Sequence, residues 1–176
     1  MKGSFLKTIT FSILVFFCSG HAIACVVAPA EQRVAVDELI SRTDNIILAK
    51  AVRAEYRNPE QTGQSNPHDV VHYDFEVLKS LKGENQSEFS LIGGLMEHDR
   101  RNHFNHHTEP DFWEDVYGRS FNMPDCIIHP TFIVGSVYLV FLDQPYHYKS
   151  FELIEKHSDP EDRDKWLAYV EEKVSE

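Results

Sequence analysis

The strictest alternation in this chain covers residues 71–78, VHYDFEVL. Apolar residues occupy the odd positions, and His72, Asp74 and Glu76 occupy even positions between them. Successive side chains of a strand point to opposite faces, so this pattern predicts a strand with one buried face and one wet face. The wet face is a candidate binding surface, and a plain solvent-facing surface is the alternative.

The rest of the chain predicts further short strands and two helical segments. Residues 35–43 have the spacing of a helical turn, whereas residues 158–162, SDPED, offer a cap, a proline and acids for a helix over 159–174. Residues 93–124 lack an apolar period, so we expect a long insertion there. Strands are expected at 45–56, which is apolar on both faces at its start, and around 89–92, 136–142 and 149–155. This arrangement predicts a mainly β fold, a small antiparallel barrel with a C-terminal helix packed on it.

The first 24 residues are typical of a secretory signal peptide. Lys2 and Lys7 precede an apolar run that ends at Cys18, and Ala22 and Ala24 are the small residues that a signal peptidase reads. The run is shorter than the about 20 residues that a membrane-spanning helix needs. We therefore expect cleavage after Ala24, no membrane span, and a single mature domain of residues 25–176 in the periplasm or outside the cell.

The mature domain is strongly acidic. The whole chain has a formal net charge of −11, and removal of the leader takes away two lysines and no acid, which gives −13. Such a surface repels phosphate backbones. We therefore do not expect nucleic acid as a partner.

Cys25 and Cys126 are the two cysteines that remain after cleavage. An even pair in an oxidising compartment predicts a disulfide. Lipidation of Cys25 is the alternative, although Ala22 stands where lipoprotein signals usually have leucine. A catalytic Cys126 assisted by His129 is a further alternative, but no electropositive setting for a thiolate is visible.

Several of these segments occur in an order that resembles a known family. After Cys25 come IILAKAV at 46–52, YDFEVLKSLKG at 73–83, and C…P.F.VG..YLVF at 126–141. Together they are similar to the netrin-like modules and the tissue inhibitors of metalloproteinases, including bacterial relatives. The resemblance implies a five-stranded, closed, oligonucleotide/oligosaccharide-binding (OB) type barrel. It also implies that the first cysteine is tied to the barrel by a disulfide.

The resemblance also implies a mode of protease inhibition. In the animal inhibitors the α-amine and carbonyl oxygen of the first cysteine chelate the zinc of the target protease, which keeps one position open for water. Cys25 followed by Val26 would supply this group if cleavage falls after Ala24. The family's second cysteine is replaced here by Val27. A zinc metalloprotease is therefore one candidate partner.

The insertion contains a cluster of histidines between Glu97 and Arg119. Neutral imidazoles suit zinc or copper, so a metal site is one hypothesis and a solvated loop without ligands is the other. Phe112 and Trp113 lie in the same insertion and are either anchors for a partner or side chains that pin the loop onto the barrel. The candidate metal ligands are His98, His103, His106 and His107.

No sequence signature of catalysis is present. The chain lacks a nucleophile elbow, a phosphate-binding glycine loop, a His-Glu-x-x-His motif and a dinucleotide fingerprint. We therefore expect an exported bacterial binding protein without a catalytic role or cofactor, whose ligand is another protein.

Overall fold

The computed structural model describes residues 29–57, 71–94, 107–114, 117–120, 126–159 and 161–176. One antiparallel sheet has the strand order β3-β2-β1-β4-β5. The elements follow the chain as η1 (Ala30–Arg33), α1 (Val36–Arg42), β1 (Ile46–Tyr56), β2 (Val71–Lys82), β3 (Glu88–Gly93), α3 (Pro110–Glu114), β4 (Val137–Phe141), β5 (Phe151–Leu153) and α4 (Lys165–Ser175). The expected mainly β class and the C-terminal helix are therefore confirmed.

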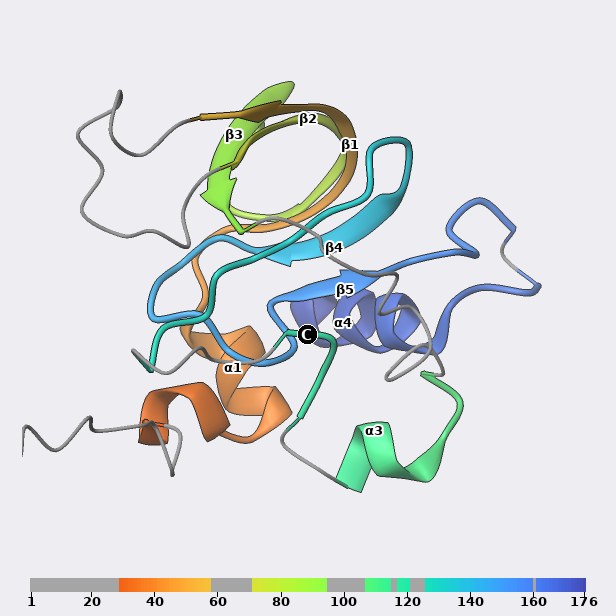
Figure 1. Ribbon diagram of the computed structural model, residues 1–176. Helices are drawn as coiled ribbons and strands as arrows, with labels where there is room; N and C mark the ends of the chain where they lie inside the picture. The colour runs from red at the N-terminus through yellow and green to blue at the C-terminus, as the bar shows by residue number, and fades with distance from the viewer. Residues whose placement is uncertain (1–28, 58–70, 95–106, 115–116, 121–125, 160) are drawn as a thin grey trace, which may run out of the picture.

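The sheet is strongly curved along β1, β2 and β3, which curl together above β4 and β5 (Figure 1). The pairing of β1 with β2 contains register shifts at Ile46/Ile47, Leu48/Ala49 and Ala51/Arg53. Each shift places an extra residue in one strand, and such bulges bend and twist a sheet. The curvature of the β1–β3 part is therefore explained by the irregular register of its two longest strands.

The sheet is not closed over the residues described, in contrast to the closed barrel expected from the sequence. β3 pairs with β2, β5 pairs with β4, and neither pairs with the other. The irregular segment before β4 lies at the end of β3 instead, where the Gly94 amide donates a hydrogen bond to the Pro130 carbonyl at 3.0 Å. A side chain at Gly93 would collide with the same carbonyl, so this close approach requires glycine.

The first half of β1 is buried on both faces, as its apolar pattern predicted. Ile47 and Ala49 belong to a core inside the curved sheet, whereas Ile46 and Leu48 belong to a core on the other face. β1 is the central strand and pairs with β2 on one side and β4 on the other. Because both faces of this part of β1 are covered, apolar residues occupy the even and the odd positions alike.

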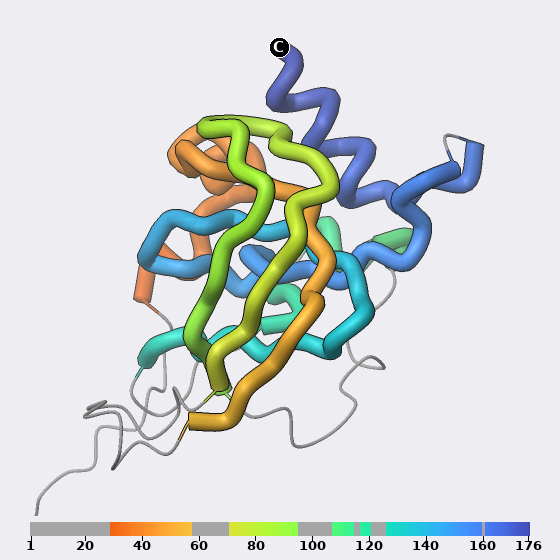
Figure 2. Tube along the Cα trace, turned by 90° about the horizontal axis from the view of Figure 1, so that it is seen from above, coloured from red at the N-terminus to blue at the C-terminus, as the bar shows by residue number. Residues whose placement is uncertain are grey.

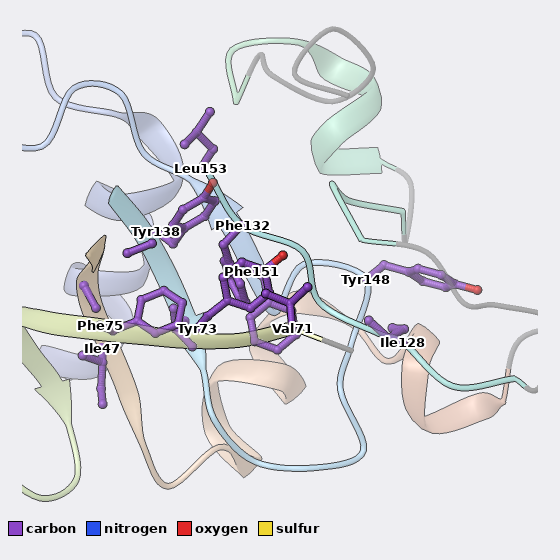
Figure 3. Close-up of a cluster of buried hydrophobic side chains, with 13 residues drawn as sticks. Ile47, Val71, Tyr73, Phe75, Ile128, Phe132, Tyr138, Tyr148, Phe151 and Leu153 are labelled. Carbon is purple, nitrogen blue, oxygen red and sulfur yellow. The ribbon is translucent and has the colours of Figure 1, made fainter. Parts of the chain in front are cut away.

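Phe132 occupies the centre of the inner core (Figure 3). It comes from the irregular segment before β4, which lies against the concave side of the sheet. Its ring makes edge-to-face contacts with aromatic rings from three strands, at centroid distances of 4.8–5.5 Å, and this geometry is the favoured one for aromatic pairs. The four partner rings are Tyr73, Phe75, Tyr138 and Phe151.

The second core lies between the sheet and the helices. In Figure 1, α1 and α4 lie on the side of β4 and β5 opposite the curled strands. Trp166 of α4 is fully buried there and stacks on Phe141 of β4 at 5.9 Å. Burying a side chain of this size contributes about 3 kcal/mol or more relative to its exposure. The C-terminal helix is thus part of the core.

Helix α4 begins later than the sequence predicted. Its N-cap is Asp164, whose carboxylate accepts hydrogen bonds from the Trp166 and Leu167 amides at 2.9 and 3.1 Å. The expected start at residue 159 was wrong because Asp159 caps a local turn instead, by accepting from the Glu161 amide at 2.9 Å. Both aspartates have the local geometry of a cap, and only the second is followed by residues that reach the core.

Candidate binding face

The outer face of β1–β3 is the convex surface on the side of the strands away from Phe132. It is formed by one rung of Glu55, His72 and Ile92, a second of Arg53, Asp74 and Ser90, and a third of Lys50, Glu76 and Glu88. Residues paired across strands share a face, so these side chains lie together. The wet face predicted from His72, Asp74 and Glu76 is therefore continued onto both neighbouring strands.

A hydrogen-bonded ladder crosses the three strands at the middle rung. The Arg53 Nε donates to Asp74 Oδ2 at 2.6 Å, and the Ser90 hydroxyl donates to Asp74 Oδ1 at 2.7 Å. These two donors, Ser90 first, hold the pKa of Asp74 below its usual range. Asp74 is thus an ionised, oriented group with both oxygens occupied, which suits recognition better than proton transfer.

Three aliphatic side chains are exposed on or beside this face. Val52 and Leu78 are 44% and 42% exposed, and Ile92 is 42% exposed. Val52 and Leu78 are the extra residues at two of the β1–β2 register shifts. A bulge re-aims a side chain out of the regular pleat, and single exposed aliphatic residues next to fixed polar groups can contact a partner.

The outer face is uncovered by the rest of the described chain. Figure 2, which is turned toward this side, shows β1, β2 and β3 next to one another in front of the other coloured elements. Helices α1 and α4 pack on β4 and on the end of β1 where Ile46 and Leu48 are buried, and Glu171 of α4 pairs with Lys79 near the end of β2. The face is therefore accessible over the rungs that hold the ladder.

Arg53 and Ser90 were not identified from the sequence. The bulge at Val52 shifts the parity of β1, so that Arg53 instead of Val52 pairs with Asp74. Ser90 lies in the next strand, opposite Asp74. Alternation within one strand cannot reveal a partner in another strand, and only the register of the sheet assigns these contacts.

His107, one of the four predicted metal ligands, is buried between two carboxylates. Its Nδ1 lies 2.7 Å from Asp164 Oδ2, and its Nε2 lies 3.4 Å from Glu152 Oε2. Burial alone would lower the pKa of His107, but the two carboxylates raise it to about 9. Both ring nitrogens therefore lie against carboxylates, which favour the protonated ring.

Glu152 connects His107 to the other residues of the buried charge cluster. Its second oxygen, Oε1, accepts from the Arg119 amide at 2.6 Å. A side chain at Gly118 would collide with this same oxygen, so the close approach of the insertion to β5 requires glycine. Lys149 is fully buried nearby, donates to the Phe112 carbonyl and lies 4.5 Å from the centroid of the Phe112 ring. These contacts fix the described end of the insertion to β5 and α4.

The aromatic pair of the insertion packs in the second core. Phe112 is 4% exposed and makes edge contacts with Trp166 at 5.4 Å. Trp113 packs against Tyr169 at 5.2 Å, and its indole nitrogen donates to the His107 carbonyl at 2.8 Å. Their surroundings are those of the pinning interpretation, in which the pair attaches the insertion to the domain. A partner-binding role for the buried Phe112 would require this part of the chain to move, whereas Trp113 is half-buried.

Several predicted residues lie outside the described part of the chain. They are the leader, Cys25, Val26, His98, His103 and His106. Cys126 is described, has a φ of 65° and accepts a hydrogen bond on its carbonyl from the Gln32 side chain at 2.7 Å. The pairing of Cys25 with Cys126, lipidation at Cys25 and the metal site therefore stay predictions.

The described residues contain no group of three or more metal-binding side chains with the geometry of a site. Among the same residues, no helix has the length and apolar character needed to cross a bilayer. The described geometry thus contains one exposed, ordered polar face and one buried charge cluster. Of these two, only the outer face of β1–β3 is placed to meet another molecule.

No protein-family model, curated protein or solved structure matches this chain. The resemblance to netrin-like modules and tissue inhibitors of metalloproteinases therefore stays a prediction from its motifs.

Proposed function

We propose that this chain is an exported, non-catalytic binding protein of the OB type, and that it binds another protein through the outer face of β1–β3. The observation that carries the proposal is the ladder of Arg53, Asp74 and Ser90 on an uncovered part of the sheet. A fixed set of charged donors and acceptors beside exposed aliphatic side chains has the composition of a protein interface.

The strand order supports the OB assignment. OB folds are five-stranded, partly open Greek-key barrels that bind ligands on the face of strands 2 and 3. Here β2 is flanked by β3 and β1, and β1 also pairs with β4. The ladder joins β2 and β3, so it lies where this class of fold places its ligands.

Charge supports a protein as the ligand. The chain carries 28 acidic and 17 basic residues, which disfavours nucleic acid and other polyanions. A protein can present the cationic and apolar groups that complement this surface.

Protease inhibition and metal capture remain alternative functions. The first depends on a terminal Cys25, and incubation of the exported protein with a panel of zinc endopeptidases tests it. The second depends on the four histidines of the insertion, of which His107 contacts Asp164 and Glu152. The other three are His98, His103 and His106. Calorimetry with zinc and copper on wild type and on a His103→Ala/His106→Ala variant tests it.

Site-specific photo-crosslinking in the native host tests the proposal. A benzophenone amino acid is introduced at Ile92, at Leu78, and at Glu155 as a control, since all three are exposed and Glu155 follows β5. We expect one protein adduct from the positions Ile92 and Leu78 and none from Glu155. The purified partner should then bind an Asp74→Ala variant at least tenfold more weakly than wild type. Absence of an adduct at both face positions would overturn the proposal.

A further inference from the structure

Two carboxylates face each other across β2 and β3 on the outer face. Glu76 and Glu88 are direct register partners, and both side chains are exposed. Residues directly opposite in antiparallel strands have Cβ atoms about 5 Å apart, and like charges in this position repel. Within the described part of the chain, no cation lies at ion-pair distance from either carboxylate.

Two cations belong to the described part of this face, Arg53 and Lys50, and only Arg53 is engaged in ion pairs. Arg53 contacts Asp74 at 2.6 Å and Glu55 at 3.8 Å. Lys50 is the register partner of Glu76 on β1 but makes no ion pair with it within 4.0 Å. The rung of Lys50, Glu76 and Glu88 thus carries two negative charges and one positive charge. It therefore attracts a further positive charge, which would relieve the repulsion between the two carboxylates.

Exposed aliphatic side chains lie along the strands on either side of this rung. Leu78 follows Glu76 by two residues on β2, and Val52 lies on β1 next to Arg53, one rung away in the other direction. Both are more than 40% exposed. An arginine suits this setting because its guanidinium forms a fork that spans two carboxylates, while its alkyl stem packs on apolar surface.

We propose that the outer face of β1–β3 binds a segment of a partner protein that presents an arginine flanked by aliphatic side chains, with the guanidinium bridging Glu76 and Glu88. This inference rests on the proposed function and names the chemistry of the partner. The acidic rung selects the cation, and Val52 and Leu78 select a peptide over a free inorganic ion.

A titration with two model peptides tests the inference. The isotope-labelled exported protein is titrated with acetyl-Val-Leu-Arg-Leu-Val-amide, and with the same peptide containing citrulline in place of arginine, in the presence of a metal chelator. Citrulline has nearly the shape of arginine and no charge. We expect the arginine peptide to move the amide resonances of Glu76, Leu78 and Glu88, and to bind at least tenfold more tightly than the citrulline peptide.

Charge-matched variants separate a specific site from general attraction to an acidic protein. Glu76→Gln/Glu88→Gln should weaken binding of the arginine peptide at least tenfold. Glu38→Gln/Glu155→Gln removes the same charge from exposed positions on α1 and after β5, and should change the affinity less than twofold. Equal losses in the two double variants, or equal binding of the two peptides, would overturn the inference.

The outcomes also separate this inference from the proposed function. If crosslinking at Ile92 and Leu78 yields a partner whose affinity is unchanged by Glu76→Gln/Glu88→Gln, the binding function stands and the arginine assignment fails. If no crosslink forms, the proposed function fails. Thermal denaturation of each variant shows whether it is folded under the conditions of the titration.

Discussion

His107 places a titratable ring in the interior of the protein, where its protonation contributes to stability. The ring is 4% exposed and lies between Asp164 and Glu152. Burial acts to lower its pKa, and the hydrogen bonds and charges of the two carboxylates raise it to about 9. Removal of the His107 ring leaves the Glu152 and Asp164 carboxylates without the counterion that lies between them, which costs several kcal/mol.

We expect the contribution of His107 to be lost at alkaline pH. Its pKa is raised in the folded state from the ordinary 6.5 to about 9, so its protonation stabilises the fold fully below about pH 6.5 and is lost as the pH rises through 9. The shift corresponds to about 3 kcal/mol. Urea denaturation of wild type and of His107→Gln at pH 6 and pH 9.5 measures it. The variant should show the smaller pH dependence, and parallel losses in the two proteins would contradict this.

Glu76 provides a second expectation at the scale of one residue. Its charge lies directly opposite that of Glu88, so Glu76→Gln should stabilise the protein by a few tenths of a kcal/mol. The exposed Glu155→Gln, which has no such partner across a strand, is the matched control and should leave stability unchanged. Chemical denaturation at low ionic strength checks both, and the gain should shrink in high salt.

At the scale of elements, the sequence predicted regular segments better than it predicted their connections. Residues 71–78 alternate strictly because β2 has one covered face, and β1 is apolar on both faces because it has two. The pattern of apolar residues does not reveal the bulge at Val52, so the sequence could not predict that Arg53 pairs with Asp74. The start of α4 was misplaced because Asp159 and Asp164 offer the same local capping chemistry.

Asp164 belongs to two elements, since it caps α4 and contacts His107 of the insertion. Asp164→Asn retains a side-chain oxygen for the cap and loses the charge, whereas Asp164→Ala loses both. We expect Asp164→Ala to destabilise the protein by about 1 kcal/mol more than Asp164→Asn. A double-mutant cycle of Asp164→Asn with His107→Gln should give a coupling of about 1–3 kcal/mol. Additive effects would show that the ion pair does not connect the insertion to the helix.

At the scale of the whole molecule, a second buried histidine has an effect on the pH dependence of stability opposite to that of His107. His147 is fully buried, donates from Nε2 to the Val34 carbonyl at 3.1 Å and accepts from the Lys149 amide at 3.0 Å. Burial lowers its pKa to about 4, so it is neutral in the folded state at pH values at which the unfolded chain would bind a proton. One ring is thus buried charged and the other is buried neutral.

The two histidines together predict where stability is greatest. The pKa of His147 is lowered from 6.5 to about 4, so its contribution is present above about pH 6.5 and lost as the pH falls through 4. The contribution of His107 is lost as the pH rises through about 9. We expect the free energy of unfolding, measured in urea between pH 4 and 10, to be largest near pH 6.5. In His107→Gln the maximum should move to higher pH, and an unmoved maximum would contradict this assignment.

The shape of the whole molecule was only partly predictable. The order of the strands follows once the two antiparallel neighbours of β1 are known. Whether the sheet closes into a barrel depends instead on the segment that lies between the two edge strands, β3 and β5. Pro130 of the irregular segment contacts Gly94 at the end of β3. Residues 126–136 show no alternation of apolar and polar residues from which this contact could be predicted. The insertion likewise looked like a polar loop, because the counterions of His107 come from residues far along the chain.

The dual role of Asp164 makes completion of the fold depend on a residue far along the chain. The helix that it caps supplies Trp166, Leu167 and Val170 to the second core, and the same carboxylate neutralises His107. A chain from which residues 164–176 were missing would have neither the cap nor the counterion. Its sheet would expose the apolar face that Trp166, Leu167 and Val170 otherwise cover.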